Sequence, residues 1–213
     1  MSKIMAVVFD MDGVLIDAKD WHFDALNRAL GHFGFAISRY DHLVTFDGLP
    51  TRKKLEMLSR ESGLPTGLHD FINDLKQVYT LELVHQLCKP RFQHEFALSR
   101  LKASGYRLAV ASNSVRQSVE LMMDKSRLKP YLDVIVSNQD VVNAKPAPDI
   151  YHKAASLLGV QCSECLVVED NPNGVEAARA AGARVMVVQE PNDVTWDRIT
   201  AEIHRINMEG SSS

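Results

Sequence analysis

The hydrophobic positions of this chain fall into five short continuous runs, and most of these runs are separated by segments with helical spacing. A continuous run of Val, Ile and Leu is typical of a strand that is buried on both faces. Strands that alternate with helices predict a doubly wound α/β fold, in which helices cover both faces of a parallel sheet. The predicted strands are Ile4–Phe9, Leu108–Ala111, Val134–Val136, Leu166–Val168 and Val185–Val188, and the later helices are Glu95–Ser104, Val115–Lys125, Ala147–Leu158 and Gly174–Ala181.

The alternation breaks between the first and second predicted strands, which lie almost a hundred residues apart. One crossover connection needs far fewer residues. Most of the gap has helical patterns, at Trp21–Leu30, Thr51–Leu58 and Leu68–Leu87. We therefore predict an α-helical cap domain at residues 16–84, inserted into a core domain made of residues 1–15 and 85–213. Because the insertion follows the first strand directly, we expect it to cover the end of that strand, exclude water and select substrates.

The composition is that of an ordinary globular protein. Of 213 residues, 46% are hydrophobic and 24% are charged, and the net charge is −3. Because there is no basic block, we expect no nucleic-acid partner. Because there is no signal-peptide pattern and no bilayer-length apolar stretch, we expect no membrane partner. We expect a monomeric cytoplasmic protein, with a final helix at Trp196–Met208 and a flexible tail at Gly210–Ser213.

The three cysteines, Cys88, Cys162 and Cys165, form an odd and sparse set that suits a reducing compartment. Cys162 and Cys165 have the CxxC spacing of redox and zinc motifs. Cys165, however, opens a predicted strand, and no second pair is present to complete a zinc site. We therefore favour a structural role for both residues.

Two carboxylates, Asp10 and Asp12, follow the first predicted strand and precede Gly13. In an open α/β sheet, ligands bind just beyond the carboxyl ends of the strands. Carboxylates in that place can hold a divalent cation, attack an electrophile or carry a proton. An ordinary turn is the alternative, because Asp and Gly are common turn residues.

Polar residues also follow the later strands. Ser112, Asn113 and Ser114 come after the second strand and could hold a phosphate with their hydroxyl and backbone N–H groups. Capping of the next helix is the alternative. Lys145 precedes Pro146, which can open a helix, and its ammonium could neutralise a phosphate or a crowded carboxylate. A solvated surface lysine is the alternative there.

Two adjacent acids, Glu169 and Asp170, follow the fourth strand. At the end of a buried strand they are costly unless a cation or hydrogen-bond donors compensate them. Together with Asp10 and Asp12 they form a predicted cluster of four carboxylates, and oxygen ligands of this kind suit Mg²⁺. Helix capping by these acids is the alternative.

In chain order, these segments resemble the four motifs of the haloacid dehalogenase (HAD) superfamily, in the phosphatase-like branch with a helical cap. Asp10-Met11-Asp12-Gly13-Val14 resembles the first motif, Ser112-Asn113 the second, Lys145-Pro146 the third and Glu169-Asp170 the fourth. The nearest likeness is to β-phosphoglucomutase and to phosphoglycolate and sugar-phosphate phosphatases. The resemblance covers nearly the whole chain and implies the strand order 5-4-1-2-3.

The resemblance also implies roles for the acids. Asp10 would be the nucleophile and form an aspartyl-phosphate. Asp12 would protonate the leaving oxygen and later activate the attacking group. The side chains of Asp10 and Asp170 and the backbone carbonyl of Asp12 would hold Mg²⁺, with help from Glu169. The second aspartate, Asp12, also favours phosphoryl transfer, because dehalogenases of the superfamily look different at this position.

The remaining roles concern the substrate. The resemblance implies that Ser112 and Lys145 hold the transferred phosphoryl group and that Asn113 supports it. In the cap, His22 stands where β-phosphoglucomutase-like sequences place a histidine, and Arg52 lies in a segment that resembles the specificity segment. His22 could act at the hinge or as a proton relay, and a surface or packing histidine is the alternative. Arg52 could grip an anionic or hydroxylated group, and a solvated helix position is the alternative. Lys76 and Tyr79 resemble a Lys/Tyr pair but are spaced one residue differently, so Lys76 is not selected.

One segment departs from the family pattern. Relatives usually have a Pro-Gly turn before the helix that leads to the second motif, whereas this chain has Lys89, Pro90 and Arg91 there. The side chains of Lys89 and Arg91 could alter the second hinge or add positive charge near the entrance. The substrate of any one relative therefore cannot be assigned to this chain by resemblance.

We therefore predict a Mg²⁺-dependent phosphatase acting on a small phosphorylated metabolite. A β-phosphoglucomutase-like sugar-phosphate mutase is the nearest alternative, since it would use the same catalytic residues. A phospho-accepting signalling receiver is a candidate from another class, but the cap insertion and the Asp10/Asp12 spacing argue against it. A non-catalytic binding protein is the third alternative, and the intact motif positions argue against that one.

Overall fold

The computed structural model describes residues 3–211 of the chain. The described chain divides into two compact units, of which the first comprises Met1–Asp17 and Lys89–Ser213 and the second Ala18–Cys88. The predicted cap had the boundaries 16 and 84. The second unit runs four residues further at its C-terminal end because its last helix continues without a break to Leu87. Among the described helices, none is both long enough and apolar enough to cross a membrane.

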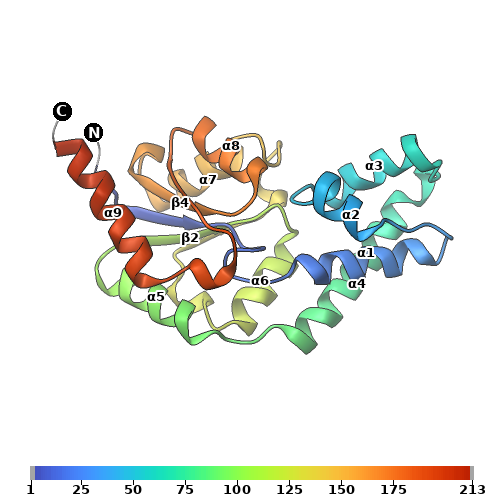
Figure 1. Cartoon of the computed structure of the whole chain (residues 1–213), viewed down its shortest axis with the longest axis horizontal. Helices are drawn as coiled ribbons and strands as arrows, with labels where there is room; N and C mark the ends of the chain where they lie inside the picture. The colour runs from blue at the N-terminus through green and yellow to red at the C-terminus, as the bar shows by residue number, and fades with distance from the viewer. Residues whose placement is uncertain (1–2, 212–213) are drawn as a thin grey trace. The chain divides into compact units, whose positions relative to one another are not determined.

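The first unit is built on a five-stranded parallel sheet (Figure 1). Its strand order, β3-β2-β1-β4-β5, is the predicted order read from the other edge, so the predicted fold class is confirmed. The strands are β1 (Ala6–Phe9), β2 (Arg107–Ala111), β3 (Val134–Val136), β4 (Cys165–Glu169) and β5 (Arg184–Val187).

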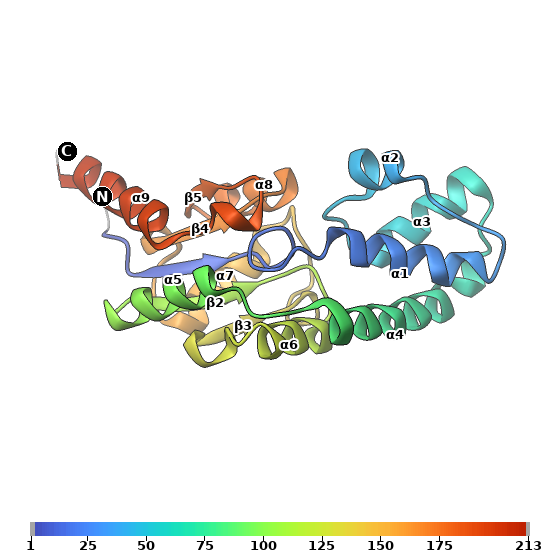
Figure 2. The ribbon, with the colours of Figure 1, turned by 60° about the horizontal axis from the view of Figure 1, so that its bottom comes forward.

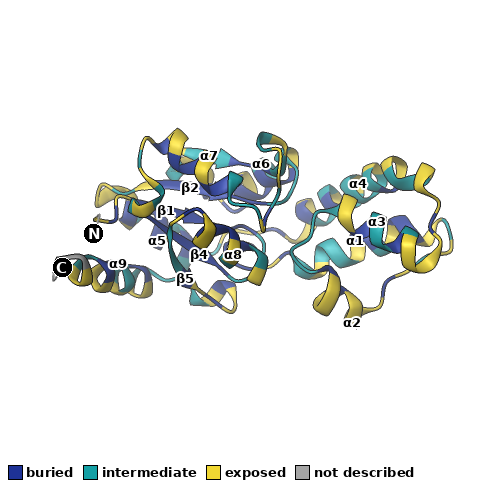
Figure 3. Ribbon diagram, turned by 90° about the horizontal axis from the view of Figure 1, so that it is seen from above, coloured by how far each residue is buried: buried dark blue, intermediate teal, exposed yellow. Residues whose placement is uncertain are grey.

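Helices cover both faces of this sheet (Figures 1 and 2). On one face, α7 packs against β1, β2 and β3, and α8 packs against β4 and β5. On the other face, α5 packs against β2, with α9 beside it. Burial follows this layering, because the central strands β1 and β4 are buried along their whole length, the edge strands β3 and β5 are partly exposed, and the outer faces of the helices are exposed (Figure 3). The helices are α5 (Phe92–Ala103), α6 (Arg116–Lys125), α7 (Asp149–Leu158), α8 (Pro172–Ala180) and α9 (Trp196–Ser211).

The register of the strands determines which residues meet at the carboxyl edge. Phe9 at the end of β1 pairs with Val110 of β2 and with Val168 of β4. The backbone N–H of Asp10 continues the ladder by donating to the Val168 carbonyl over 2.9 Å. Asp10, which directly follows β1, is therefore level with Ala111 and Glu169, the last residues of β2 and β4, as expected for adjacent parallel strands.

The C-terminal helix is longer than predicted. The sequence pattern indicated a helix over Trp196–Met208, and this helix is present, but α9 continues to Ser211. The first two residues of the predicted flexible tail therefore belong to the helix, and the last two lie outside the described residues.

The second unit is helical and has its own core. Helix α1 packs against α4, and α3 packs against α4. The core contains Leu26 and Leu30 of α1, Leu55 of α3 and Ile72 of α4. The helices are α1 (Lys19–Gly31), α2 (Arg39–Asp41), α3 (Thr51–Ser62) and α4 (His69–Leu87), and a π-helical turn, η1, spans His42–Phe46.

The segment that contains α2 and η1 was not predicted. Its apolar residues do not mark its buried face: Leu43 and Val44 are exposed, whereas His42 and Phe46 are buried. The spacing of four between the two buried residues follows one helical face. The buried face of this segment cannot be predicted from hydrophobicity, because a polar histidine is buried while its more hydrophobic neighbours are exposed.

The imidazole of His42 is buried, and its two nitrogens have an unusual environment. Its side chain is 2% exposed, and within the described residues neither ring nitrogen has a hydrogen-bond partner of good geometry. The ring lies 5.1 Å from the ring of Phe23, centroid to centroid. Burial, reinforced by the nearby ammonium of Lys54, lowers the pKa of His42 to about 4, although Asp47 and the backbone of Lys19 oppose the shift. The ring is therefore neutral at neutral pH.

This burial predicts a pH-dependent contribution to stability. Between about pH 6.5 and pH 4 the unfolded chain binds a proton at His42 that the folded chain does not, so stability falls as the pH is lowered through this range. We expect the free energy of unfolding of the wild type, relative to that of His42→Gln, to fall by about 2 kcal/mol between pH 7 and pH 5. Denaturant unfolding at both pH values measures this difference, with the exposed His204→Gln as control. A difference independent of pH would contradict the prediction.

Candidate active site

The centre of the site is the ammonium of Lys145, which is 4% exposed. Its Nζ donates to Asp10 Oδ1 over 2.6 Å, to Glu169 Oε1 over 2.7 Å and to the carbonyl of Ala111 over 2.9 Å. The three acceptors come from the ends of β1, β4 and β2. The prediction that Lys145 neutralises crowded carboxylates is thus supported against the alternative of a solvated surface lysine.

The charged groups at this centre shift one another's pKa values. Burial alone would lower the pKa of Lys145, but the carboxylates of Asp10 and Glu169 outweigh burial and raise that pKa well above its usual value. Burial also raises the pKa of Asp10 well above its usual value, and Lys145 only partly opposes this because Glu169, Asp12 and Asp170 add negative charge. One ammonium does not balance the charge of these acids, so further positive charge at this edge would favour the ionised form of Asp10.

Glu169 has protein donors at both carboxylate oxygens. Besides Lys145, the hydroxyl of Tyr151 donates to Oε1 over 2.8 Å. The backbone N–H groups of Asp170 and Asn171 donate to Oε2 over 2.9 Å and 3.1 Å. These four bonds occupy about all the acceptor positions of a carboxylate. Glu169 therefore fixes the loop after β4 in addition to compensating Lys145.

Three carboxylates gather at this edge of the sheet. One oxygen each from Asp10, Glu169 and Asp170 lie within 4.8 Å of one another. A group of hard oxygen ligands suits Mg²⁺, and the repulsion among the acids makes a divalent cation favourable there. The alternative of helix capping by these acids is wrong, because Asn171 caps α8 by accepting from the Asn173 N–H over 3.0 Å.

The side chain of Asp12 lies outside this group of three. Its Oδ2 accepts from the hydroxyl of Ser114 over 2.9 Å. Ser114 follows β2, so this hydrogen bond joins the loops that follow two neighbouring strands. The two aspartates of the first motif thus have different surroundings, since Asp10 contacts an ammonium and Asp12 a hydroxyl.

The loop after β2 begins with a buried serine and does not cap α6. Ser112 is fully buried, and its Oγ accepts from the N–H of Ser114 over 3.0 Å. The amide of Asn113 pairs with the backbone of Lys145, accepting from its N–H over 3.0 Å and donating to its carbonyl over 3.3 Å. The N-cap position of α6 is Val115, which makes no capping bond through its side chain, so the capping alternative is wrong for this loop. Likewise Pro146 does not open α7, which begins at Asp149.

Comparison with known proteins places this arrangement in a family. The sequence model of the haloacid dehalogenase-like hydrolases matches residues 7–188. The chain belongs to this family. The phosphorylated carbohydrates phosphatase of Thermotoga maritima is 31% identical over 193 residues, which cover 88% of this chain and 87% of that protein. The predicted family and enzyme class, a HAD-like phosphatase, are confirmed.

Solved structures similar to this HAD-like hydrolase include those of CbbY and β-phosphoglucomutase. The structure of CbbY from Rhodobacter sphaeroides in complex with phosphate has a TM-score of 0.78 and 26% identity, and the match covers 86% of this chain and 85% of that chain. The structure of β-phosphoglucomutase from Clostridium difficile has a TM-score of 0.84 and 19% identity, over 96% of this chain and 99% of that chain. At 19% identity, the similarity to this β-phosphoglucomutase is evidence for a shared fold alone.

The cap candidates of this hydrolase have contrasting environments within the second unit. The side chain of Arg52 is 85% exposed, with Nε 4.0 Å from Glu56 Oε1, as on a solvated helix surface. Lys76 Nζ lies 3.2 Å from His22 Nδ1, and since an ammonium has no acceptor, Nδ1 accepts this bond. The one-residue difference in the spacing of Lys76 and Tyr79 argued against a substrate role for Lys76, yet the structure places Lys76 beside His22. Lys54, for which the sequence pattern gives no signal, is buried.

The remaining sequence candidates are structural or exposed. Burial raises the pKa of the Cys165 thiol to about 12, and that of Cys162 is also raised, so neither has the thiolate of a redox motif. At the second hinge, Arg91 is the N-cap residue of α5, and its guanidinium lies 3.7 Å from Asp17 and 3.2 Å from the side-chain oxygen of Asn192.

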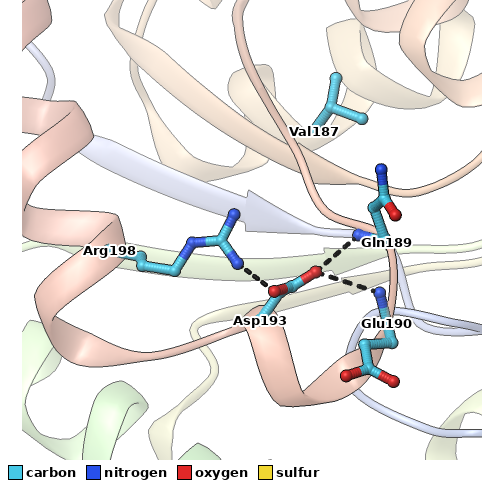
Figure 4. Close-up of a pocket in the computed structure, with 5 residues that line it drawn as sticks. All are labelled: Val187, Gln189, Glu190, Asp193 and Arg198. Atoms are coloured by element: carbon cyan, nitrogen blue, oxygen red, sulfur yellow. Dashed lines mark hydrogen bonds and ion pairs between the residues drawn. The ribbon is translucent and has the colours of Figure 1, made fainter.

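A pocket at the end of β5 is separate from the Lys145 centre. It is lined by Val187, Gln189, Glu190, Asp193 and Arg198 (Figure 4). Asp193 accepts from the N–H groups of Gln189 and Glu190 over 2.8 Å and 3.3 Å and also from Arg198. The bond from the Glu190 N–H belongs to a capping box at the start of the short 3₁₀-helix Pro191–Asp193, in which the Glu190 side chain accepts from the N–H of Asp193 in return. The charged groups of this pocket therefore have structural partners.

Glu169 is packed directly against Gly174, so a larger residue at position 174 tests whether Glu169 is held in place. A Cβ added at Gly174 would lie 1.6 Å from Glu169 Oε1, and Glu169 cannot move without breaking its hydrogen bonds. We expect Gly174→Ala to destabilise the fold by about 2 kcal/mol or more, as overpacking of a buried site does. Denaturant unfolding measures this loss. The control is Gly67→Ala, because an added Cβ there meets nothing within 4 Å. Equal stability of the two variants would show that Glu169 is not held as described.

Proposed function

We propose that this HAD-like hydrolase is a Mg²⁺-dependent phosphatase of small phosphorylated metabolites, of the sugar-phosphate or phosphoglycolate kind, and that it works through an aspartyl-phosphate on Asp10. The observation that carries the proposal is the buried contact of Asp10 with Lys145, beside Glu169 and Asp170. Relatives named as phosphatases of phosphorylated carbohydrates and of fructose 1-phosphate support the substrate class.

The proposed chemistry has two displacements at phosphorus. A carboxylate oxygen of Asp10 attacks the phosphorus, and the bond from phosphorus to the leaving oxygen breaks while Asp12 gives that oxygen a proton. Asp12, now a carboxylate, takes a proton from water as the water oxygen attacks the aspartyl-phosphate. Inorganic phosphate leaves, and both aspartates return to their starting forms.

Electrostatics decides whether this attack is possible. An anionic nucleophile approaches an anionic phosphate only where cations offset the repulsion. Lys145 supplies one positive charge directly at Asp10. We assign Ser112 and Lys145 to the transferred phosphoryl group and Asn113 to holding the backbone of Lys145, which its two hydrogen bonds to that backbone support.

The acid group fits Mg²⁺. The side chains of Asp10 and Asp170 and the backbone carbonyl of Asp12 would hold the ion, while Glu169, whose oxygens already accept four hydrogen bonds, would assist. When bound, the ion would supply positive charge beside Asp10 and so favour its ionised form.

We assign substrate selection to the cap and propose His22 and Arg52 as substrate-binding residues. Within the second unit, the neighbouring Lys76 adds a cation beside His22. Cations suit a phosphorylated or carboxylated substrate.

We also propose the cytoplasm as the location, because the cysteines are free thiols.

An assay of the full chain tests the proposal. On a panel of sugar phosphates and phosphoglycolate with Mg²⁺, we expect net release of phosphate. Asp10→Asn should lower kcat roughly 10³-fold or more, because it removes the nucleophile. Asp170→Asn should weaken Mg²⁺ binding, measured by calorimetry without substrate, by roughly tenfold or more.

The outcomes of this assay are distinct. Isomerisation of a sugar phosphate without net release would indicate a mutase with the same catalytic residues. Full turnover by Asp10→Asn would exclude the proposed nucleophile. Unchanged Mg²⁺ binding by Asp170→Asn would exclude the proposed metal site.

A further inference from the structure

The hydroxyl of Ser114 is directed at a catalytic candidate. Its Oγ donates to Asp12 Oδ2 over 2.9 Å, although the two residues are 102 positions apart in the chain. The sequence indicated either phosphate binding or capping of α6 for this serine. The helix begins at Arg116 and its N-cap is Val115, so capping does not explain the direction of the hydroxyl.

The backbone of Ser114 is fixed on both sides. Its N–H donates to Oγ of the fully buried Ser112 over 3.0 Å, and its carbonyl accepts from the N–H of Asn138 over 3.2 Å. Ser112 in turn donates through its N–H to the carbonyl of Val136 over 3.0 Å, which continues the pairing of β2 with β3. The hydroxyl of Ser114 therefore projects from a rigid support.

The backbone around Asp12 is also fixed, which leaves the orientation of its carboxylate to its side-chain contacts. The N–H of Gly13 donates to the Ile16 carbonyl over 2.7 Å, and the N–H of Ile16 donates to the Met11 carbonyl over 2.9 Å. These bonds form a compact loop directly after β1. A hydroxyl that donates to one carboxylate oxygen limits the rotation of the group and makes its two oxygens different.

We infer that Ser114 is a positioning residue for Asp12. Its hydrogen bond to Oδ2 orients the carboxyl group so that Oδ1 exchanges the proton with the leaving oxygen. The inference rests on the proposed function, in which Asp12 is the proton donor. It gives Ser114 a role in proton transfer, separate from the binding of the phosphoryl group by Ser112 and Lys145.

The dependence on the leaving group distinguishes this role from a merely structural one. An alkyl phosphate needs a proton on its leaving oxygen, whereas p-nitrophenyl phosphate leaves as a stable anion and needs it much less. The value of kcat/KM reports the step in which the leaving group departs. We expect Ser114→Ala to lower kcat/KM about tenfold for the best alkyl phosphate, a part of the 10²–10⁴ that general acid catalysis contributes, and less than about threefold for the aryl ester. Ser114→Thr, which keeps the hydroxyl, should restore the ratio.

A double-mutant cycle makes the test independent of whether threonine fits. If Ser114 acts through Asp12, Ser114→Ala should have no further effect on kcat/KM in an Asp12→Ala background. Ser99→Ala is the matched control, since the Ser99 hydroxyl donates only to the Phe96 carbonyl among the described hydrogen bonds of that side chain.

Each outcome bears on the inference. An equal loss for both esters, no loss, or additive effects with Asp12→Ala would overturn it. Failure of the proposed function has a different signature, because it would appear as full activity of Asp10→Asn. A chain in which Asp10→Asn is inactive but Ser114→Ala lowers both esters equally would keep the phosphatase and lose only the role of Ser114.

Discussion

The buried ammonium of Lys145 is the group on which the rest of this site depends. It touches the ends of β1, β2 and β4 at once through Asp10, Ala111 and Glu169. A buried charge is tolerated only when partners surround it, and removing one partner leaves the others uncompensated. The ammonium therefore holds three strand ends in one arrangement, while the acids around it exceed its charge. That excess is what makes the same place suitable for a metal ion and an anionic substrate.

The parallel sheet explains why so many functional groups can lie together. The register puts Asp10 after β1 level with Glu169 at the end of β4, and the loop after β2 adds hydroxyl and amide groups beside them. Packing of α7 and α8 on one face and of α5 on the other buries the strands and holds this edge rigid. The two aspartates of the first motif, Asp10 and Asp12, have different contacts. Asp10 contacts a cation, and Asp12 contacts the hydroxyl of Ser114.

Much of this could be predicted from the sequence, for physical reasons. Continuous apolar runs reveal buried strands, and polar residues at their ends converge because parallel strands end at one edge. Contacts that depend on side-chain direction could not be predicted. Nothing in the sequence shows that Glu169 accepts from Tyr151, that Ser114 donates to Asp12, or that Lys76 lies beside His22. Each of these pairs joins residues distant in sequence, and the unpredicted turn at His42–Phe46 buries an imidazole where a pattern reading expects an aliphatic residue.

The central claim is that Asp10 carries the phosphoryl group between two displacements, and the stereochemical course at phosphorus tests it most directly. Each in-line displacement inverts the configuration, so two give overall retention. The measurement uses the best substrate of the panel, made chiral at phosphorus with oxygen isotopes and sulfur, with turnover in isotopically labelled water. Retention of configuration in the released thiophosphate is the result that an aspartyl-phosphate on Asp10 predicts. Inversion would mean that water attacks the substrate directly, and it would contradict the account.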